Sequence, residues 1–183
     1  MICYFVRHGQ TDWNVQGRFQ GLEDIPLNAE GRRQIERTAR MLSGVRFDAA
    51  FSSPLSRALD TAKAVLRFHP GLEIVINDRI IENDLGLLSG LLPEERAAFD
   101  ASGKPNLAEP FESSVGRMEE AIRAAYERYP NGTVLMVTHG GLIGRYLRHL
   151  GQTGFVLPNG CAVLFETNAA ETRFLRIIDP PDA

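Results

Sequence analysis

Two histidines each stand one residue after an apolar, strand-like run of this chain and could act together on one substrate. His8 follows the run 2–6, and His139 follows the run 134–137. In α/β sheets, ligands bind outside the carboxyl ends of the strands, so both side chains are expected at one edge of a sheet. An imidazole can serve as a nucleophile or move a proton near neutral pH, which makes both residues catalytic candidates.

Charged residues that suit a phosphate accompany these histidines. Arg7 precedes the first of them, and Arg57 lies in the first turn of a predicted helix after the run 49–52. The guanidinium fork matches phosphate oxygens, and helix N-termini add N–H donors that favour an anion. Glu82 follows a third strand candidate, 74–76, where a carboxylic acid can protonate a leaving oxygen. These residue types together predict a pocket for phosphoryl transfer.

The periodicity of the chain predicts the elements that position these residues. Strand-like runs alternate with helical patterns, which favours an α/β fold: a three-layer α/β/α sandwich with a mainly parallel central sheet. The closing runs, 161–166 and 173–178, are candidates for an antiparallel pair at an edge. Helix starts are predicted at Asn28, at Ser53-Pro54 with proline first, at Ser114 and at Leu142.

Two segments lack such periodicity. Residues 9–27 are polar and glycine-rich and are predicted to form a long ordered loop. Residues 83–113 contain three prolines and three glycines, with a short helix expected over 94–100, and are the candidate insertion or lid. The length of 183 residues favours one domain, 1–183, that includes this lid.

Composition limits the classes of partner. The net charge of −3 does not favour a nucleic-acid or anionic-membrane partner. No run reaches transmembrane length, and no signal peptide is recognised, so a cytoplasmic protein is expected. Cys3 and Cys161 lie in apolar runs and are expected to be buried, reduced thiols. A homodimer is left open.

The ordered motifs of the chain resemble those of the histidine phosphatase superfamily, also called the phosphoglycerate mutase-like family. R-H-G-Q-T-D-W-N spans 7–14, S-S-P-L-S-R-A-L-D-T-A spans 52–62, and V-T-H-G-G spans 137–141. Gln20-Gly21, D-I-P-L at 24–27, and Gly31 with Gln34 lie between the first two motifs. The resemblance runs from residue 5 to about residue 145, in the family's order, and implies a phosphoglycerate mutase-like fold.

The resemblance also implies a role for each matched residue. His8 would attack phosphorus and become a phosphohistidine, and Glu82 would protonate the leaving alcohol and then activate water. Glu94, Glu95, Glu109 and Glu112 remain alternatives for that carboxylate. The phosphate-binding positions would be Arg7, Asn14, Gln20, Gly21, Arg57, His139 and Gly140. No metal or cofactor is required, because the arginines supply the positive charge.

The chemistry demands different states of the two histidines. His8 must be neutral to attack, and its other ring nitrogen is expected to donate to a backbone carbonyl in the Gly9 loop. His139 is expected to act as a cation whose pKa the phosphate raises. Trp13 and Phe19 either line the pocket or anchor the long loop. Arg18 is expected in solvent, with contact to the substrate as the alternative, and His69 and His149 are expected to be structural.

Hydrolysis is favoured over mutase chemistry. The lid segment 91–113 offers only Arg96 and Lys104 as basic residues, and a short lid with little positive charge suits water entry. The chain reads G-L-L-S-G over 86–90, without the tryptophan and glutamate of many phosphatase members. We therefore expect a phosphoric monoester hydrolase of the histidine acid phosphatase type that acts on a small phosphorylated metabolite. Mutase-type phosphotransfer and a non-catalytic phosphate-binding module are the alternatives.

Overall fold

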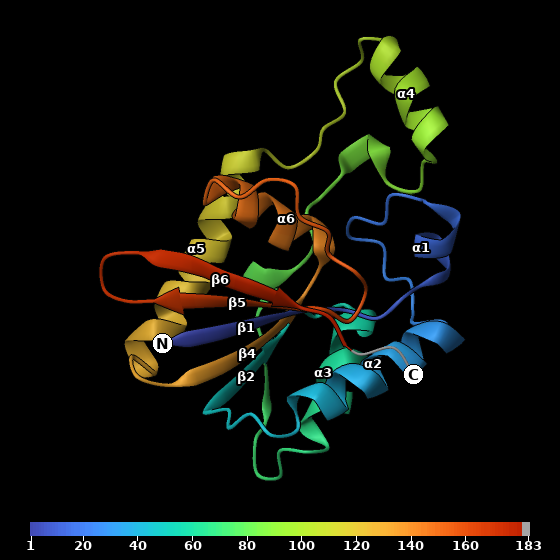
Figure 1. The fold of residues 1–183 in the computed structure, drawn as a ribbon. Coiled ribbons are helices and arrows are strands. Elements are labelled where there is room, and N and C mark those ends of the chain that lie inside the picture. The colour runs from blue at the N-terminus through green and yellow to red at the C-terminus, as the bar shows by residue number, and fades with distance from the viewer. Residues whose placement is uncertain (181–183) are drawn as a thin grey trace.

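The computed structural model describes residues 1–180 as a six-stranded sheet with helices on both faces (Figure 1). Residues 181–183, the end of the predicted domain 1–183, lie outside the described residues. The strands are β1 Ile2–Arg7, β2 Ala49–Ser52, β3 Ile74–Ile76, β4 Thr133–Thr138, β5 Ala162–Thr167 and β6 Thr172–Ile178. The helices are α1 Asp12–Gln16, α2 Ala29–Leu42, α3 Ser56–Leu66, α4 Pro93–Ala101, α5 Phe111–Arg128 and α6 Gly140–His149, with short 3₁₀ turns η1 Asp78–Ile80 and η2 Gly86–Leu88.

The order of strands explains why distant motifs meet. The order is β3-β2-β4-β1-β5-β6, and the first four strands are mutually parallel. β5 pairs antiparallel with β1 and β6 pairs antiparallel with β5, which confirms the mainly parallel sheet and its antiparallel closing pair. Arg7 is in register with Thr138, and Ser52 is in register with Val137. The residues that follow β1, β2 and β4 therefore emerge at one edge.

Two apolar layers hold the helices on the sheet. Along β4, Val134 and Met136 join the core under α5 and α6, whereas Leu135 and Val137 join the core under α2 and α3. All four side chains are fully buried. Full burial of such a side chain contributes about 1.5–3 kcal/mol. Alternation across the strand thus produces the predicted three-layer sandwich.

Two predicted helix starts are wrong, because contacts beyond the local sequence set the first turn. α3 begins at Ser56, where the backbone N–H and the hydroxyl both donate to the Asp24 carboxylate at 2.8 Å. Pro54 lies in the preceding turn and not at the first helical position. α5 begins one turn before Ser114, whose hydroxyl donates to the Phe111 carbonyl inside the helix.

The other boundaries agree with the prediction or shift by two residues at most. The predicted loop 9–27 contains the short helix α1, which Thr11 caps. α6 begins at Gly140 and not at Leu142. Asn28 caps α2 as predicted, since its side chain accepts from the Gly31 N–H at 2.8 Å.

The segment 83–113 stands apart from the sheet in Figure 1, with η2 and α4 at the top of the view. The predicted helix over 94–100 is confirmed as α4, and none of its residues is buried. Burial raises the pKa of Cys3 and of Cys161 to about 12, as expected of inert thiols. Within residues 1–180, no helix combines the length and the hydropathy that a membrane span requires.

Candidate active site

The two predicted histidines meet at the sheet edge. Their ring centroids lie 5.2 Å apart, and the rings are tilted by 59°. His8 follows β1 and His139 follows β4, which are adjacent parallel strands. Both side chains are buried, and His139 lies behind the surface of the pocket that His8 lines. Adjacent strand ends therefore build the predicted pair.

His8 is arranged as a neutral imidazole. Its Nδ1 lies 2.7 Å from the Gly9 carbonyl oxygen, so Nδ1–H donates there and Nε2 keeps its lone pair. Burial, together with the charges of Arg57 and Arg7, holds the pKa of His8 well below its usual value of 6.5. The predicted backbone acceptor in the Gly9 loop is thus in place.

His139 makes a different set of contacts. Its Nε2 lies 2.7 Å from the Ser53 hydroxyl, and its buried Nδ1 has no hydrogen-bond partner in the part of the chain described. Burial, then the neighbouring His8 and Arg57, holds the pKa of His139 well below 6.5. The expected cation is therefore not the state that the free site favours, and an arriving phosphate dianion would act in the opposite direction. Ser53 was missed as a site residue, although it stands directly after β2.

The two motif arginines are fixed by backbone carbonyls. Arg57 is fully buried and donates from Nη1 to the Glu23 carbonyl at 2.6 Å and from Nη2 to the Gly21 carbonyl at 3.0 Å. Arg7 donates from Nη1 to the Leu157 carbonyl. The Nε of each arginine is buried without a partner among residues 1–180. A buried hydrogen-bond donor without a partner destabilises the protein, and a bound anion would supply the missing acceptor.

Glu82 lies at the N-terminus of α6. Its Oε1 accepts from the Leu142 N–H at 2.9 Å and from the Asn83 N–H at 2.8 Å, and its Oε2 accepts from the Gly141 N–H at 3.0 Å. Among the described residues that line the pocket, Glu82 is the one carboxylate. Its four predicted alternatives on the lid segment do not line the pocket.

An arginine of α5 positions the backbone around Glu82. Arg117 Nη1 donates to the carbonyls of Arg79 and Ile81 at 2.7 and 2.6 Å, and Nη2 donates to the Glu82 carbonyl at 3.2 Å. The same guanidinium binds both carboxylate oxygens of Glu109 at 2.8 and 3.0 Å. Nothing in the motif pattern pointed to Arg117, because its partners are backbone atoms far away in sequence.

Hydrogen bonds to neighbouring groups orient the side-chain amides at the site. Asn14 Oδ1 accepts from the Thr11 N–H at 3.1 Å and from Asn159 Nδ2 at 3.2 Å, which leaves the Asn14 amide N–H groups available for a ligand. Asn159 Nδ2 also lies 3.1 Å from the His8 carbonyl, a contact that the motifs did not predict. Gln20 lines the pocket, and its Oε1 accepts from the Thr11 hydroxyl.

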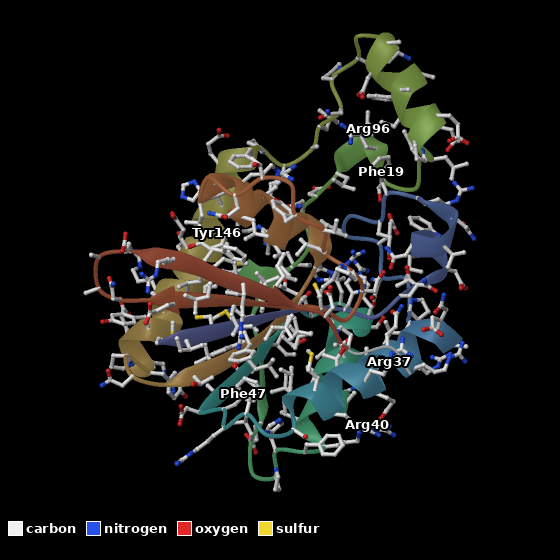
Figure 2. All side chains as sticks on the ribbon, viewed as in Figure 1. Phe19, Arg37, Arg40, Phe47, Arg96 and Tyr146 are labelled. Atoms are coloured by element: carbon white, nitrogen blue, oxygen red, sulfur yellow. The ribbon has the colours of Figure 1, made fainter. Side chains whose placement is uncertain are left out.

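A cavity of about 650 Å³ lies at this site, and its volume is within the range of small-molecule binding sites. Gly21 and Gly140 line it, and a Cβ at Gly140 would lie 2.8 Å from Arg7 Nε. Phe19 lines the cavity beneath Arg96, whose guanidinium carbon lies 5.1 Å from the Phe19 ring centroid (Figure 2).

Of the remaining candidates, Arg18 lies elsewhere than expected, whereas Trp13, His69 and His149 agree with a stated expectation. Arg18 is part of the cavity wall and donates to the Gly90 carbonyl at 2.7 Å, so the expectation of a solvated charge is wrong. Trp13 packs beside Gly90 and is not among the lining residues. His69 and His149 also lie outside the cavity wall.

The cavity is strongly basic. Six arginines line it: Arg7, Arg18, Arg57, Arg96, Arg145 and Arg148. This charge is greater than the two basic residues of the lid segment, Arg96 and Lys104, suggested. Two of the six come from α6, which crosses the cavity wall because its opposite face packs on the sheet.

Known proteins share this fold and these motifs. Residues 3–179 match the family described as histidine phosphatase superfamily (branch 1). The protein called uncharacterized phosphatase PhoE of Bacillus subtilis (strain 168) is 38% identical over 150 residues, which cover 81% of this chain and 76% of that protein. Phosphoserine phosphatase 1 of Hydrogenobacter thermophilus is 34% identical over 149 residues, which cover 73% of this chain and 68% of that protein.

A solved structure agrees with these matches. YhfR from Bacillus stearothermophilus superposes with a TM-score of 0.85 at 27% identity, over 94% of each chain. The match to a family model, two phosphatase relatives and this structure together cover nearly the whole chain. The chain therefore belongs to the histidine phosphatase superfamily (branch 1) and is an enzyme of the phosphatase or phosphotransferase type.

Proposed function

We propose that the chain is a metal-independent phosphomonoesterase that acts on a small phosphorylated metabolite through a phosphohistidine on His8. The observation that carries the proposal is the state of His8. Its Nδ1 is committed to the Gly9 carbonyl, and its pKa is held low by burial and by the charges of Arg57 and Arg7, whose buried Nε–H groups have no partner among residues 1–180. A neutral nucleophile amid unpaired cationic donors suits attack on a phosphate.

The reaction has two steps. In the first, His8 Nε2 attacks phosphorus, the bond to the ester oxygen breaks, and the leaving oxygen takes a proton from Glu82. In the second, the Glu82 carboxylate takes a proton from water, the water oxygen bonds to phosphorus, and the P–N bond breaks to regenerate His8. Donors from Arg7, Arg57 and His139 stabilise the charge on the phosphoryl oxygens in both steps.

The segment 83–113 favours hydrolysis over mutase chemistry. α4 stands away from the sheet in Figure 1 and buries none of its own residues. A mutase has to keep water from its phosphoenzyme, whereas a hydrolase must admit water. The expected lid therefore gives little protection to a phosphohistidine.

The test measures phosphate release from p-nitrophenyl phosphate in the presence of EDTA. We expect activity that EDTA does not remove, that His8→Ala abolishes and that the exposed control His149→Ala retains. A quenched reaction should contain an acid-labile phosphoenzyme that is absent from His8→Ala. Activity that EDTA abolishes but His8→Ala retains would refute the mechanism.

A second assay separates the mutase alternative. The protein is incubated with 3-phosphoglycerate and 2,3-bisphosphoglycerate, and both free phosphate and 2-phosphoglycerate are followed. Free phosphate as the main product supports the proposal. Conversion to 2-phosphoglycerate that is faster than phosphate release would assign the site to a mutase.

A further inference from the structure

The cavity carries more positive charge than one phosphate requires. Six arginines line it against one carboxylate, Glu82, although the whole chain has a net charge of −3. Some arginines elsewhere are paired with carboxylates, as Arg37 is with Glu30 and Arg79 is with Glu120. The excess in the cavity is therefore a local feature that calls for a ligand of more than one anionic group.

One face of α6 supplies part of this excess. Gly141, Gly144, Arg145 and Arg148 all line the cavity, and their spacing places them on one side of the helix. The two glycines leave the floor of this face without side chains. Arg148 folds back along the helix, since its Nη1 lies 3.7 Å from the Cβ position of Gly144. Its guanidinium therefore points toward the phosphate end of the cavity.

The two α6 arginines lack carboxylate partners. Arg145 donates from Nη1 to the Glu109 carbonyl and to the Ser114 hydroxyl, each at 3.0 Å, and forms no ion pair within residues 1–180. Arg148 makes no side-chain hydrogen bond and no ion pair with any described residue. Their charges remain available to a ligand.

Two other arginines of the cavity wall, Arg18 and Arg96, already bind groups of the protein. Arg18 donates to the Gly90 carbonyl and to Gln16, and Arg96 pairs with Asp100 at 3.3 Å and covers Phe19 (Figure 2). The helical rise places Arg145 and Arg148 about 6 and 10 Å along the axis beyond Gly141, which binds Glu82. A second anion on the leaving group would lie over this stretch of α6.

We propose that Arg145 and Arg148 form a second anion subsite, so that the preferred substrates are phosphomonoesters whose leaving group carries a carboxylate or a second phosphate. This inference rests on the proposed phosphatase function and specifies its substrate class. Arg148 is the specificity-determining residue, because it has no competing side-chain partner among residues 1–180. Arg145 adds charge while it also anchors the Glu109–Pro110 backbone.

The experiment compares substrates that differ in one anionic group. The carboxylate arm uses 3-phosphoglycerate against glycerol 3-phosphate, and the phosphate arm uses fructose 1,6-bisphosphate against fructose 6-phosphate. In the wild-type protein, kcat/KM should favour the doubly anionic member of at least one pair by about tenfold to a hundredfold, the range of a charge-assisted hydrogen bond. The arm that shows the preference identifies the anion.

Arg148→Ala should reduce that kcat/KM ratio by at least about tenfold, and Arg148→Glu should bring it below one. Arg40→Ala is the control, because Arg40 is an exposed arginine on α2, away from α6 in Figure 2, and should keep the wild-type ratio. The ratio should change mainly through KM, since the second anion is bound equally in the ground and transition states.

The possible failures are distinguishable. If the wild-type protein releases phosphate but prefers neither doubly anionic member, or if Arg148→Glu keeps the preference, the subsite is refuted while the phosphatase function stands. If no phosphomonoester is hydrolysed, the proposed function fails. The subsite is then judged by calorimetric titration of the His8→Ala protein with each pair, where equal affinities for the two members would refute it.

Discussion

Gly141→Ala should disable the acid–base step without unfolding the protein. A Cβ at position 141 would lie 2.6 Å from Glu82 Oε1 and 2.7 Å from Asn83 Nδ2. Ordinary contact begins near 3.4 Å, so the carboxylate must retreat by about 0.8 Å. That movement also weakens the hydrogen bonds from the Gly141 and Leu142 N–H groups, which now hold Glu82 at 3.0 and 2.9 Å.

The expected loss follows from this displacement. A misplacement of about 1 Å at a reacting group costs about a hundredfold in rate, or about 2.7 kcal/mol of barrier. Because the clash is with the mobile end of a side chain, and because alanine favours a helix over glycine by up to about 1 kcal/mol, the free energy of unfolding should change by less than about 1 kcal/mol. The kinetic loss is therefore separable from instability.

The assay compares kcat for glycerol 3-phosphate and p-nitrophenyl phosphate with urea denaturation of the same proteins. The loss should be greater for the alkyl ester, whose leaving oxygen depends on the proton from Glu82. Gly116→Ala on α5 is the matched control, since no heavy atom lies within 4 Å of its Cβ position. A folded Gly141→Ala protein with wild-type kcat on glycerol 3-phosphate would refute the assignment of Glu82.

Three further outcomes are expected. The free energy of unfolding should fall as the pH is lowered from about 6.5 to about 5, by up to about 1.4 kcal/mol per pH unit for each of His8 and His139, because the unfolded chain binds protons that the buried rings do not. Urea denaturation across this range checks it, and a flat profile would contradict it. Ser53→Ala should destabilise the fold by about 1–3 kcal/mol and lower kcat, since His139 Nε2 loses its 2.7 Å partner; denaturation and steady-state rates measure both effects. Arg117→Met should lower the free energy of unfolding by about 2–4 kcal/mol, because the Glu109 carboxylate loses its partner. Arg117→Lys should have a kcat below that of the wild-type protein, because an ammonium cannot reproduce the guanidinium fork; a lysine variant with full activity would argue against the positioning role.

Much of the fold could be predicted from the sequence, because the signals for its buried strands and for the cap of α2 lie within each segment. The runs that became β1 and β4 are apolar throughout, as parallel strands buried on both faces must be, and Asn28 caps α2 with its own side chain. The start of α3 was not readable, because Asp24 supplies its cap from a separate segment. The start of α5 was predicted one turn late, because Ser114 resembles a cap although its hydroxyl bonds within the helix.

The sequence by itself determined the chemical set of the candidate site. Arg7, His8, Arg57 and His139 stand beside strand ends, and strand ends of a parallel sheet share one edge, so their meeting follows from topology alone. Only the tertiary structure decided which charged side chains line the part of the cavity beside α6, where the leaving group would bind. The apolar residues of α6 predict which side is buried, but the cavity over the other side, with Arg148 in it, exists only because the loop 155–157 and the segment 82–96 fold across from it. Such long-range packing has no local periodicity in the chain, and the second anion subsite inferred from it depends on contacts that only the folded protein makes.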